Sequence, residues 1–198
     1  MIRLAVLVSL ALALLAGCGG GSTETAAEPA PAQPPPPPAA TTQAAPAETG
    51  AAPAECVEEE FPDQGAEHFE GPPLGFEYNS FPATSGPHAH QPIPWDLYTE
   101  PLPEFNLVHN LEHGGIVVQV GEAVSLDDVN ALIEWYVASP DGVVVAPLPE
   151  LGGKIAATAW QHLLTCTGFD EKALSAFRDT YRFNGPEKLS PDVMKPGM

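Results

Sequence analysis

The chain of 198 residues has 26 acidic side chains against 7 Lys and Arg, which gives a formal net charge of −19 at pH 7. A surface this acidic repels phosphate backbones and anionic lipid headgroups. We therefore expect no nucleic-acid partner. The composition does not identify a protein partner.

Residues 1–17 have the pattern of a signal peptide. Arg3 gives one early positive charge, and the apolar run 4–15 that follows is too short to cross a bilayer. The run ends in Leu-Ala-Gly before Cys18, which resembles the cleavage box of bacterial lipoproteins. This predicts a lipidated Cys18 that anchors an extracytoplasmic protein to the cell membrane. The alternative is an ordinary signal peptide in which Cys18 is incidental.

Residues 18–55 are rich in Ala, Pro, Thr, Gly and Glu and include five consecutive prolines at 34–38. The segment has almost no large apolar side chains, so burial cannot offset the entropy of ordering it. It is expected to be a disordered tether, stiffened where prolines favour polyproline II. The remaining residues, 56–198, are long enough for one domain with one core.

Apart from Cys18, the chain has two cysteines, Cys56 and Cys166. In an exported protein an even pair is more often joined than free, so we predict a disulfide between them. Closing a loop of roughly 100 residues contributes about 4.7 kcal/mol in the chain-entropy treatment. Two reactive thiols are the alternative.

The first part of this domain is predicted to be mostly irregular. Gly and Pro interrupt residues 61–75, and the apolar–polar alternation at 76–78 indicates a short strand. The proline density of 82–103 excludes a regular helix. A Pro/Gly/His-rich loop region of this length is commonly functional.

The second part shows regular periodicity. Apolar runs predict buried strands at 116–120, 143–146 and 155–160. A helix should begin after Ser125 and stop before Pro140. Its expected buried face comprises Val129, Leu132, Ile133, Tyr136 and Val137.

A second helix is expected at about 170–183. Its pattern turns three side chains inward, Leu174, Phe177 and Tyr181, and leaves Arg178 and Arg182 outside. These elements together predict an α+β fold with a small mixed sheet and two helices.

Five of the six histidines lie between residues 68 and 113. His88 and His90 would share a face of an extended segment, so both imidazoles could reach one ion. His109 and His113 would lie on adjacent turns of one helix face, whereas in a strand they would be about 13 Å apart. A shared ion therefore requires a short helix at 105–113, with Gly114 as its stop.

The sequence thus predicts a metal site with His88, His90, His109 and His113 as ligands. His68 and Glu112 are possible extra ligands, and Glu112 could also orient a ligand. Imidazole nitrogens favour zinc or copper(II). With only three methionines, a methionine-rich copper(I) site is not expected.

Two alternatives remain open at this stage. The histidines could instead bond loop carbonyls and hold the proline-rich stretch on the sheet, which would make the protein a structural or interaction module of the envelope. Residues 109–113 also fit the His-x-x-Glu-His pattern of zinc hydrolases, with Glu112 as candidate general base. That pattern needs a long helix and a further ligand, but Gly114 and Gly115 follow at once. His162 is interpreted as structural.

Several motifs carry a family resemblance. They are Thr84-Ser85-Gly86-Pro87-His88, Val108-His109-Asn110-Leu111-Glu112-His113-Gly114, Ala157-Thr158-Ala159-Trp160, Phe169-Asp170 and Gly185-Pro186-Glu187. Together they resemble the bacterial domain of unknown function 3105 over residues 56–187. Ala83 stands where the family often has a second proline. The resemblance implies a bacterial, envelope-associated protein and supplies no reaction.

Overall fold

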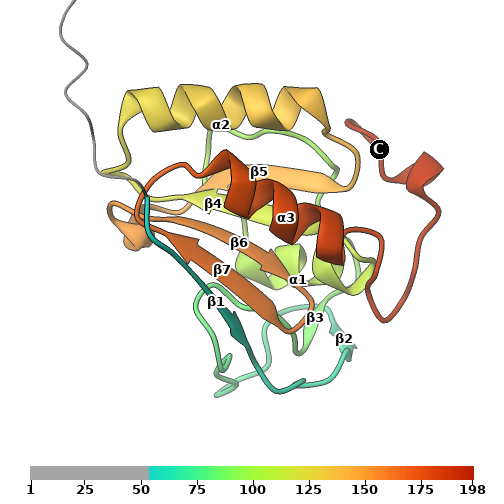
Figure 1. Ribbon diagram of the computed structural model, residues 1–198. Coiled ribbons are helices and arrows are strands. Elements are labelled where there is room, and N and C mark those ends of the chain that lie inside the picture. The colour runs from blue at the N-terminus through green and yellow to red at the C-terminus, as the bar shows by residue number, and fades with distance from the viewer. Residues whose placement is uncertain (1–53) are drawn as a thin grey trace, which may run out of the picture. The chain divides into compact units, whose positions relative to one another are not determined.

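The computed structural model describes residues 54–198, and its centre is a five-stranded mixed sheet in the order β1-β7-β6-β4-β5 (Figure 1). The strands are β1 (Cys56–Glu60), β4 (Ile116–Val120), β5 (Val143–Pro147), β6 (Ile155–Ala159) and β7 (His162–Cys166). β4 and β5 pair in parallel and the other neighbours pair antiparallel. The predicted α+β fold with a mixed sheet is confirmed.

Three α-helices accompany the sheet in the described residues: α1 (Glu104–Glu112), α2 (Leu126–Ala138) and α3 (Glu171–Tyr181). The Oγ of Ser125 accepts from the amide of Asp128 and caps α2, and the carboxylate of Asp170 caps α3. α2 and α3 are the two helices predicted from apolar periodicity. α1 is the additional helix that the spacing of His109 and His113 required for a shared ion.

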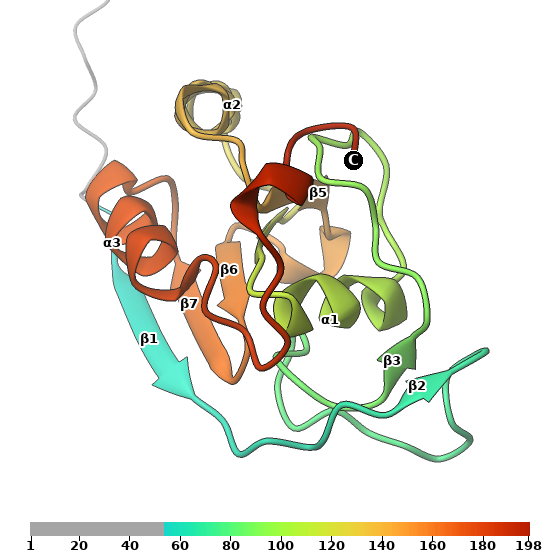
Figure 2. The same ribbon diagram turned by 90° about the vertical axis from the view of Figure 1, so that its right-hand side faces the viewer.

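The helices divide between the two faces of the sheet. α2 and α3 lie over one face, while α1 lies on the other with the short strands β2 (His68–Phe69) and β3 (His88–Ala89) (Figure 2). Ile116 and Val118 of β4 belong to the core under α2 and α3, whereas Val117 belongs to the core under α1. Because both faces are covered, the inner strands β4 and β6 are mostly apolar, with one buried polar residue each, Gln119 and Thr158.

The buried face of α2 differs from the prediction. Ile133 and Val137 are exposed, and Trp135 is buried instead. The Trp135 ring reaches α3, where its Nε1 donates to the Oγ of Ser175 at 2.9 Å and the Arg178 guanidinium lies over it at 4.9 Å. Packing between the two helices therefore rotates the buried face of α2.

The same contact corrects the prediction for the arginines of α3. The side chains of Arg178 and Arg182 are only 11% and 17% exposed. Their guanidinium groups lie over aromatic rings: that of Arg182 lies over Phe183 at 5.0 Å, just as that of Arg178 lies over Trp135. The prediction that both arginines point outward is wrong.

The disulfide between Cys56 and Cys166 is present, with an S–S distance of 2.08 Å. The two residues face each other in the β1–β7 ladder, so the bridge fastens the edge strand to its neighbour. Neither strand was predicted. β1 is acidic and mostly exposed. β7 follows β6 after the turn Trp160–Gln161, whose first residue the predicted strand 155–160 includes.

The expected strand at 76–78 is wrong, because these residues have no regular structure. The short extended pieces lie elsewhere: β2 and β3 pair in parallel, with His68 opposite His88 and Phe69 opposite Ala89. This two-stranded ribbon brings the segment before residue 70 beside the segment after residue 87.

The predicted signal peptide, the lipidated Cys18 and the tether up to residue 53 lie outside the described residues. Within residues 54–198, no helix is both long and apolar enough to cross a membrane.

Candidate metal centre

α1 carries one side of the centre. Leu107, Val108 and Leu111 are buried on the sheet side of the helix. His109 and Glu112, three residues apart, then share another face. This packing holds α1 on the sheet and so fixes the backbone positions of His109 and Glu112.

The loop before β3 is tied to the start of α1. The Glu104 carboxylate accepts from the amide of Ala83 at 2.7 Å, and burial raises the pKa of this carboxyl. Further along, the side-chain amide of Asn110 makes two bonds with the backbone of Ile93, at 2.9 and 2.7 Å. The proline-rich loop is therefore hydrogen-bonded both to the start of α1 and to a residue near its end.

The end of α1 is held by the C-terminal segment. His113 is the C-cap, and Gly114 follows with a φ of +81°, a conformation that favours glycine. The amide of Phe183 donates to the carbonyl of Gly114 at 2.7 Å, and the amide of Glu187 donates to the carbonyl of Glu112 at 3.0 Å. Gly185 lies so close to the Glu112 carbonyl that a Cβ would not fit.

β3 and β2 carry the other side of the centre. His88 is completely buried, with its ring edge-to-face against Trp160 at 6.2 Å. The ladder places His68 of β2 directly opposite it. The two imidazoles meet at an Nε2–Nε2 distance of 3.2 Å.

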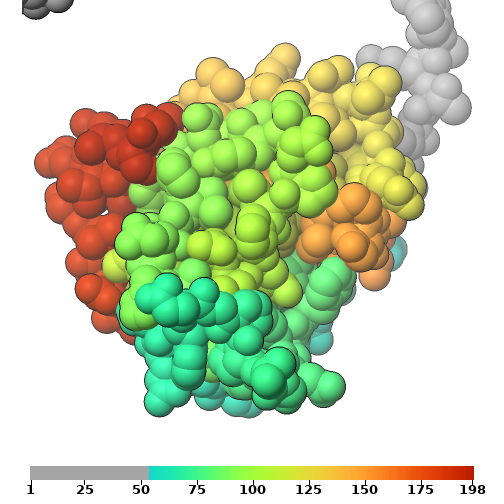
Figure 3. Space-filling view, turned by 180° about the vertical axis from the view of Figure 1, so that it is seen from behind, coloured from blue at the N-terminus to red at the C-terminus, as the bar shows by residue number. Residues whose placement is uncertain are grey.

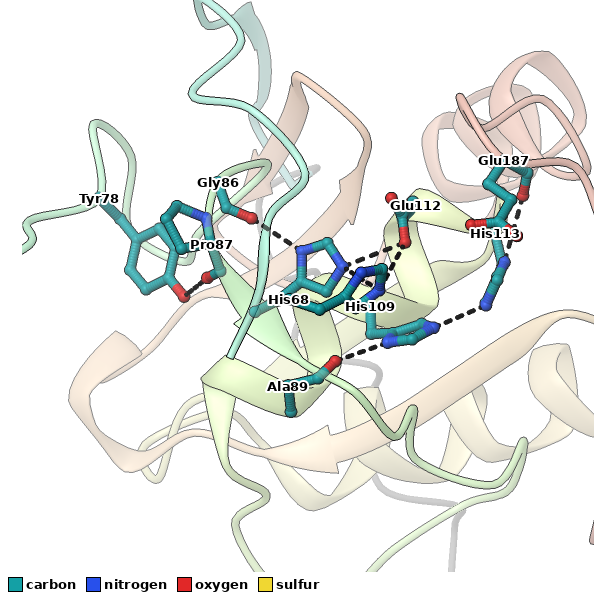
Figure 4. Close-up of polar contacts among 10 residues, drawn as sticks. His68, Tyr78, Gly86, Pro87, Ala89, His109, Glu112, His113 and Glu187 are labelled. Carbon is teal, nitrogen blue, oxygen red and sulfur yellow. Dashed lines mark hydrogen bonds and ion pairs between the residues drawn. The ribbon is translucent and has the colours of Figure 1, made fainter. Parts of the chain in front are cut away.

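Glu112 completes a triangle with these two histidines. Its Oε2 lies 3.1 Å from the Nε2 of His88 and 3.3 Å from the Nε2 of His68 (Figure 4). His109 adds a fourth group, and one potential ligand atom from each of the four residues lies within 4.8 Å of the others. This His/Glu group could hold a metal ion.

The size of the triangle matches a coordination sphere. With metal–ligand bonds of about 2.0–2.1 Å, neighbouring ligand atoms lie roughly 3.3 Å apart in a tetrahedral site and roughly 3.0 Å apart in an octahedral one. The three sides of 3.1, 3.2 and 3.3 Å fall in this range. One cation could therefore contact all three atoms with little rearrangement.

Hydrogen bonding orients His88 for this role. Its Nδ1 lies 2.8 Å from the carbonyl of Gly86 and donates to it, because a carbonyl can only accept. In the neutral ring the Nε2 lone pair then faces the Glu112 carboxylate, and two acceptors repel each other. A second proton or a metal cation relieves this repulsion, and a backbone bond of this kind is typical of metal-ligating histidines.

His109 is oriented in a similar way but has a second partner. Its Nδ1 donates to the carbonyl of Ala89 at 2.6 Å, and its Nε2 lies 2.7 Å from the Nε2 of His113. Burial, followed by the neighbouring imidazoles, lowers the pKa of His109, which favours the neutral ligand form. To bind an ion through Nε2, His109 must first give up the contact that this atom makes with His113.

Of the six candidate ligands predicted from the sequence, the structure brings four together and leaves two outside the group. It brings His88 and His109 together with His68 and Glu112, the two residues that we considered extra ligands. His113 touches His109 and, through Nδ1, the carbonyl of Glu187 at 3.2 Å. His90 is exposed and lies outside this group. The hydrolase alternative requires a free Glu112, whereas its Oε2 contacts two imidazoles.

His162 lies away from the centre, stacked on the Tyr181 ring at 4.1 Å. The inclusion of His68 could not be read from its surroundings in the sequence, because it depends on pairing with His88, twenty residues away. For Glu112 a signal existed, since it lies three residues after His109 on a predicted helix.

The fold and the cluster define an α+β domain with a buried His/Glu group that could hold a metal ion. Residues 74–193 match the family model described as "Protein of unknown function (DUF3105)", so the chain belongs to this family. The match confirms the resemblance found in the motifs and includes His88, His109 and Glu112, while His68 precedes it. No curated protein and no solved structure matches the chain.

Proposed function

We propose that the protein binds one transition-metal ion through His68, His88 and Glu112, with His109 as fourth ligand once it has exchanged His113 for the ion. The carrying observation is the triangle of ligand atoms with sides of 3.1 to 3.3 Å. The bond from His88 to Gly86 supports it, since this bond fixes the ring with Nε2 directed at the centre.

The ligand set favours zinc or copper(II). Imidazole nitrogens suit both ions, and two histidines with one glutamate also form the ligand set of several zinc enzymes. Two histidines and a carboxylate can hold iron(II) as well, if positions remain open. The three-ligand face leaves room for His109 or for a small molecule, so binding and catalysis are both compatible with it.

The membrane location is also a proposal. The first 18 residues support export and lipidation on Cys18, and residues 18–55 would then tether the domain to the outer side of the cell membrane. The disulfide between Cys56 and Cys166 supports export, because such bonds persist in oxidising compartments. Labelling cells with radioactive palmitate tests this: we expect label in the wild type and none in Cys18→Ser.

Metal analysis of protein purified without a histidine tag tests the central proposal. We expect about one equivalent of zinc or copper, and at least about a 100-fold loss of Co²⁺ affinity in His88→Ala. If His88→Ala does not fold, Glu112→Gln provides the test instead. This variant keeps the shape of the side chain and should also weaken binding. His162→Ala is the matched control. No stoichiometric metal in the wild type, or wild-type Co²⁺ affinity in both site variants, overturns the proposal.

A second candidate is a structural module of the envelope in which the histidines brace the proline-rich loop. The bonds of His109 to the Ala89 carbonyl and of Asn110 to Ile93 favour it. It predicts that zinc does not change the melting temperature. A bound metal stabilises by about 2.7 kcal/mol when its concentration is 100 times Kd, so the two candidates separate clearly in thermal unfolding.

A further inference from the structure

His90 is left out of the centre, yet it touches one of its ligands. Its ring stacks on the His68 ring at 5.4 Å with an interplanar angle of 16°, and the His68 ring in turn meets the His88 ring at 4.5 Å. The side-chain exposure falls along this series from 52% for His90 to 30% for His68 and 0% for His88. Three imidazoles therefore lead from solvent to the buried ligands.

An acidic side chain accompanies the outer end of the series. The Oε1 of Glu70 lies 3.8 Å from the Nε2 of His90, and Glu70 is almost fully exposed. A carboxylate and an imidazole at this separation offer two ligands to a cation that is still partly hydrated. The formal net charge of −19 raises the local concentration of cations at the surface.

His68 is placed to be shared between the outer and inner positions. Its Nε2 faces His88 and Glu112 at 3.2 and 3.3 Å, while its ring lies under that of His90. It belongs to β2, which pairs with β3 over two residues only, whereas Glu112 and His88 are buried. The teal segment that contains β2 lies at the surface, against green residues of the α1 side (Figure 3).

We propose that His90 and Glu70 form an outer binding position from which a divalent cation passes to His68 and then to the buried centre. The ion would exchange water for protein ligands in steps instead of losing its hydration shell at once. This inference rests on the proposed function, because it describes how the ion reaches that centre. It adds a position that is occupied only during loading and release.

Stopped-flow measurements of Co²⁺ binding to the full chain without a histidine tag test the inference. His90→Ala should slow association roughly tenfold. Dissociation should slow by the same factor, because release follows the same route in reverse. His162→Ala, which removes another partly exposed histidine outside the centre, should leave both rates unchanged.

Glu70→Gln separates charge from coordination. It should slow association less than His90→Ala does, and the effect should shrink as salt rises from low to high concentration, because an exposed charge is screened.

The outcomes distinguish this inference from the proposed function. If the wild type does not bind Co²⁺, Zn²⁺ or Cu²⁺ at all, both fail together. If it binds but His90→Ala shows wild-type association and dissociation rates, the outer position alone is refuted. Faster dissociation with unchanged association in His90→Ala would make His90 a permanent ligand and would also overturn the loading role.

Discussion

The face of the sheet under α2 and α3 buries almost only apolar side chains, whereas the face under α1 combines a smaller apolar core with buried polar groups. The first core includes Ile116, Leu132 and Phe177. Among the described residues, the one buried side-chain atom without a hydrogen-bond partner, the Tyr136 hydroxyl, belongs to this side. On the α1 face, His88, His109 and Glu112 are buried and each has a polar partner.

The difference shows how one sheet can separate stability from chemistry. Apolar burial contributes about 25 cal/mol per Å² and needs no particular geometry, so the α2–α3 face can supply folding energy. Buried imidazoles and carboxylates are costly unless each is paired. The α1 face therefore depends on its hydrogen bonds, or on a bound cation, and changes there should affect binding as well as stability.

The disulfide offers the largest test of this separation. Replacing Cys56 and Cys166 by serine should lower the free energy of unfolding by about 4.7 kcal/mol, because a long loop is no longer closed in the unfolded chain. Urea unfolding measures this loss. Co²⁺ affinity in the cold should stay unchanged, since the bridge joins β1 to β7 at the sheet edge. A marked loss of affinity would contradict the separation.

The next test compares one core residue from each face. Phe177→Ala should cost about 4 kcal/mol and leave Co²⁺ affinity intact, whereas Leu111→Ala should cost about 3 kcal/mol and weaken binding as well. Both side chains are almost fully buried, but Leu111 is adjacent to Glu112 on α1. Urea unfolding and Co²⁺ titration of the same preparations give both quantities. Equal affinities in the two variants would mean that the centre is insensitive to the packing of α1.

His113→Ala should have a smaller effect, lowering the free energy of unfolding by about 1–2 kcal/mol. It removes the partner of the His109 Nε2 and a contact with the Glu187 carbonyl. Because His109 is then free to contact the ion, metal affinity should not fall. Thermal unfolding and Co²⁺ titration measure the two effects. A loss of affinity comparable to that of His88→Ala would instead make His113 a ligand.

The smallest expected effect is the pH dependence of the metal-free protein. Burial lowers the pKa of His109 below its usual 6.5, so the unfolded chain takes up the proton more readily than the folded one. The stabilising effect of the neutral ring is present above pH 6.5 and is lost as pH falls from there towards the lowered pKa. The slope should not exceed about 1.4 kcal/mol per pH unit for this residue.

Urea unfolding with a chelator present, between pH 7.5 and 5.5, measures this slope. His109→Gln should give a flatter profile than the wild type, with His162→Ala as control. Identical profiles for the wild type and His109→Gln would show that His109 does not carry the effect.

Sequence patterns predicted those elements that are specified by residues within or directly beside them. The β-branched runs predicted β4 and β5, and the cap at Ser125 predicted the start of α2. The spacing of His109 and His113 indicated α1 only under the condition that they share an ion. The prediction of the disulfide followed from the number of cysteines together with the expectation of export.

Features that depend on distant partners could not be predicted in this way. β1 ends in three consecutive glutamates, and it is a strand because β7 pairs with it. His90 leaves the ribbon because β3 ends at Ala89, so the alternation of a longer strand does not apply to it. His68 belongs to the cluster through register with His88, and the buried side of α2 depends on where α3 packs.

The bonds from Phe183 to the Gly114 carbonyl and from Glu187 to the Glu112 carbonyl have a consequence for biosynthesis. Ribosomes make the C-terminal segment last, so the helix that carries Glu112 obtains its final backbone partners only when translation is nearly finished. A polypeptide interrupted before residue 183 would lack them. The final backbone partners of Glu112 and Gly114 therefore require the complete C-terminal segment, although every residue of the His/Glu group precedes it.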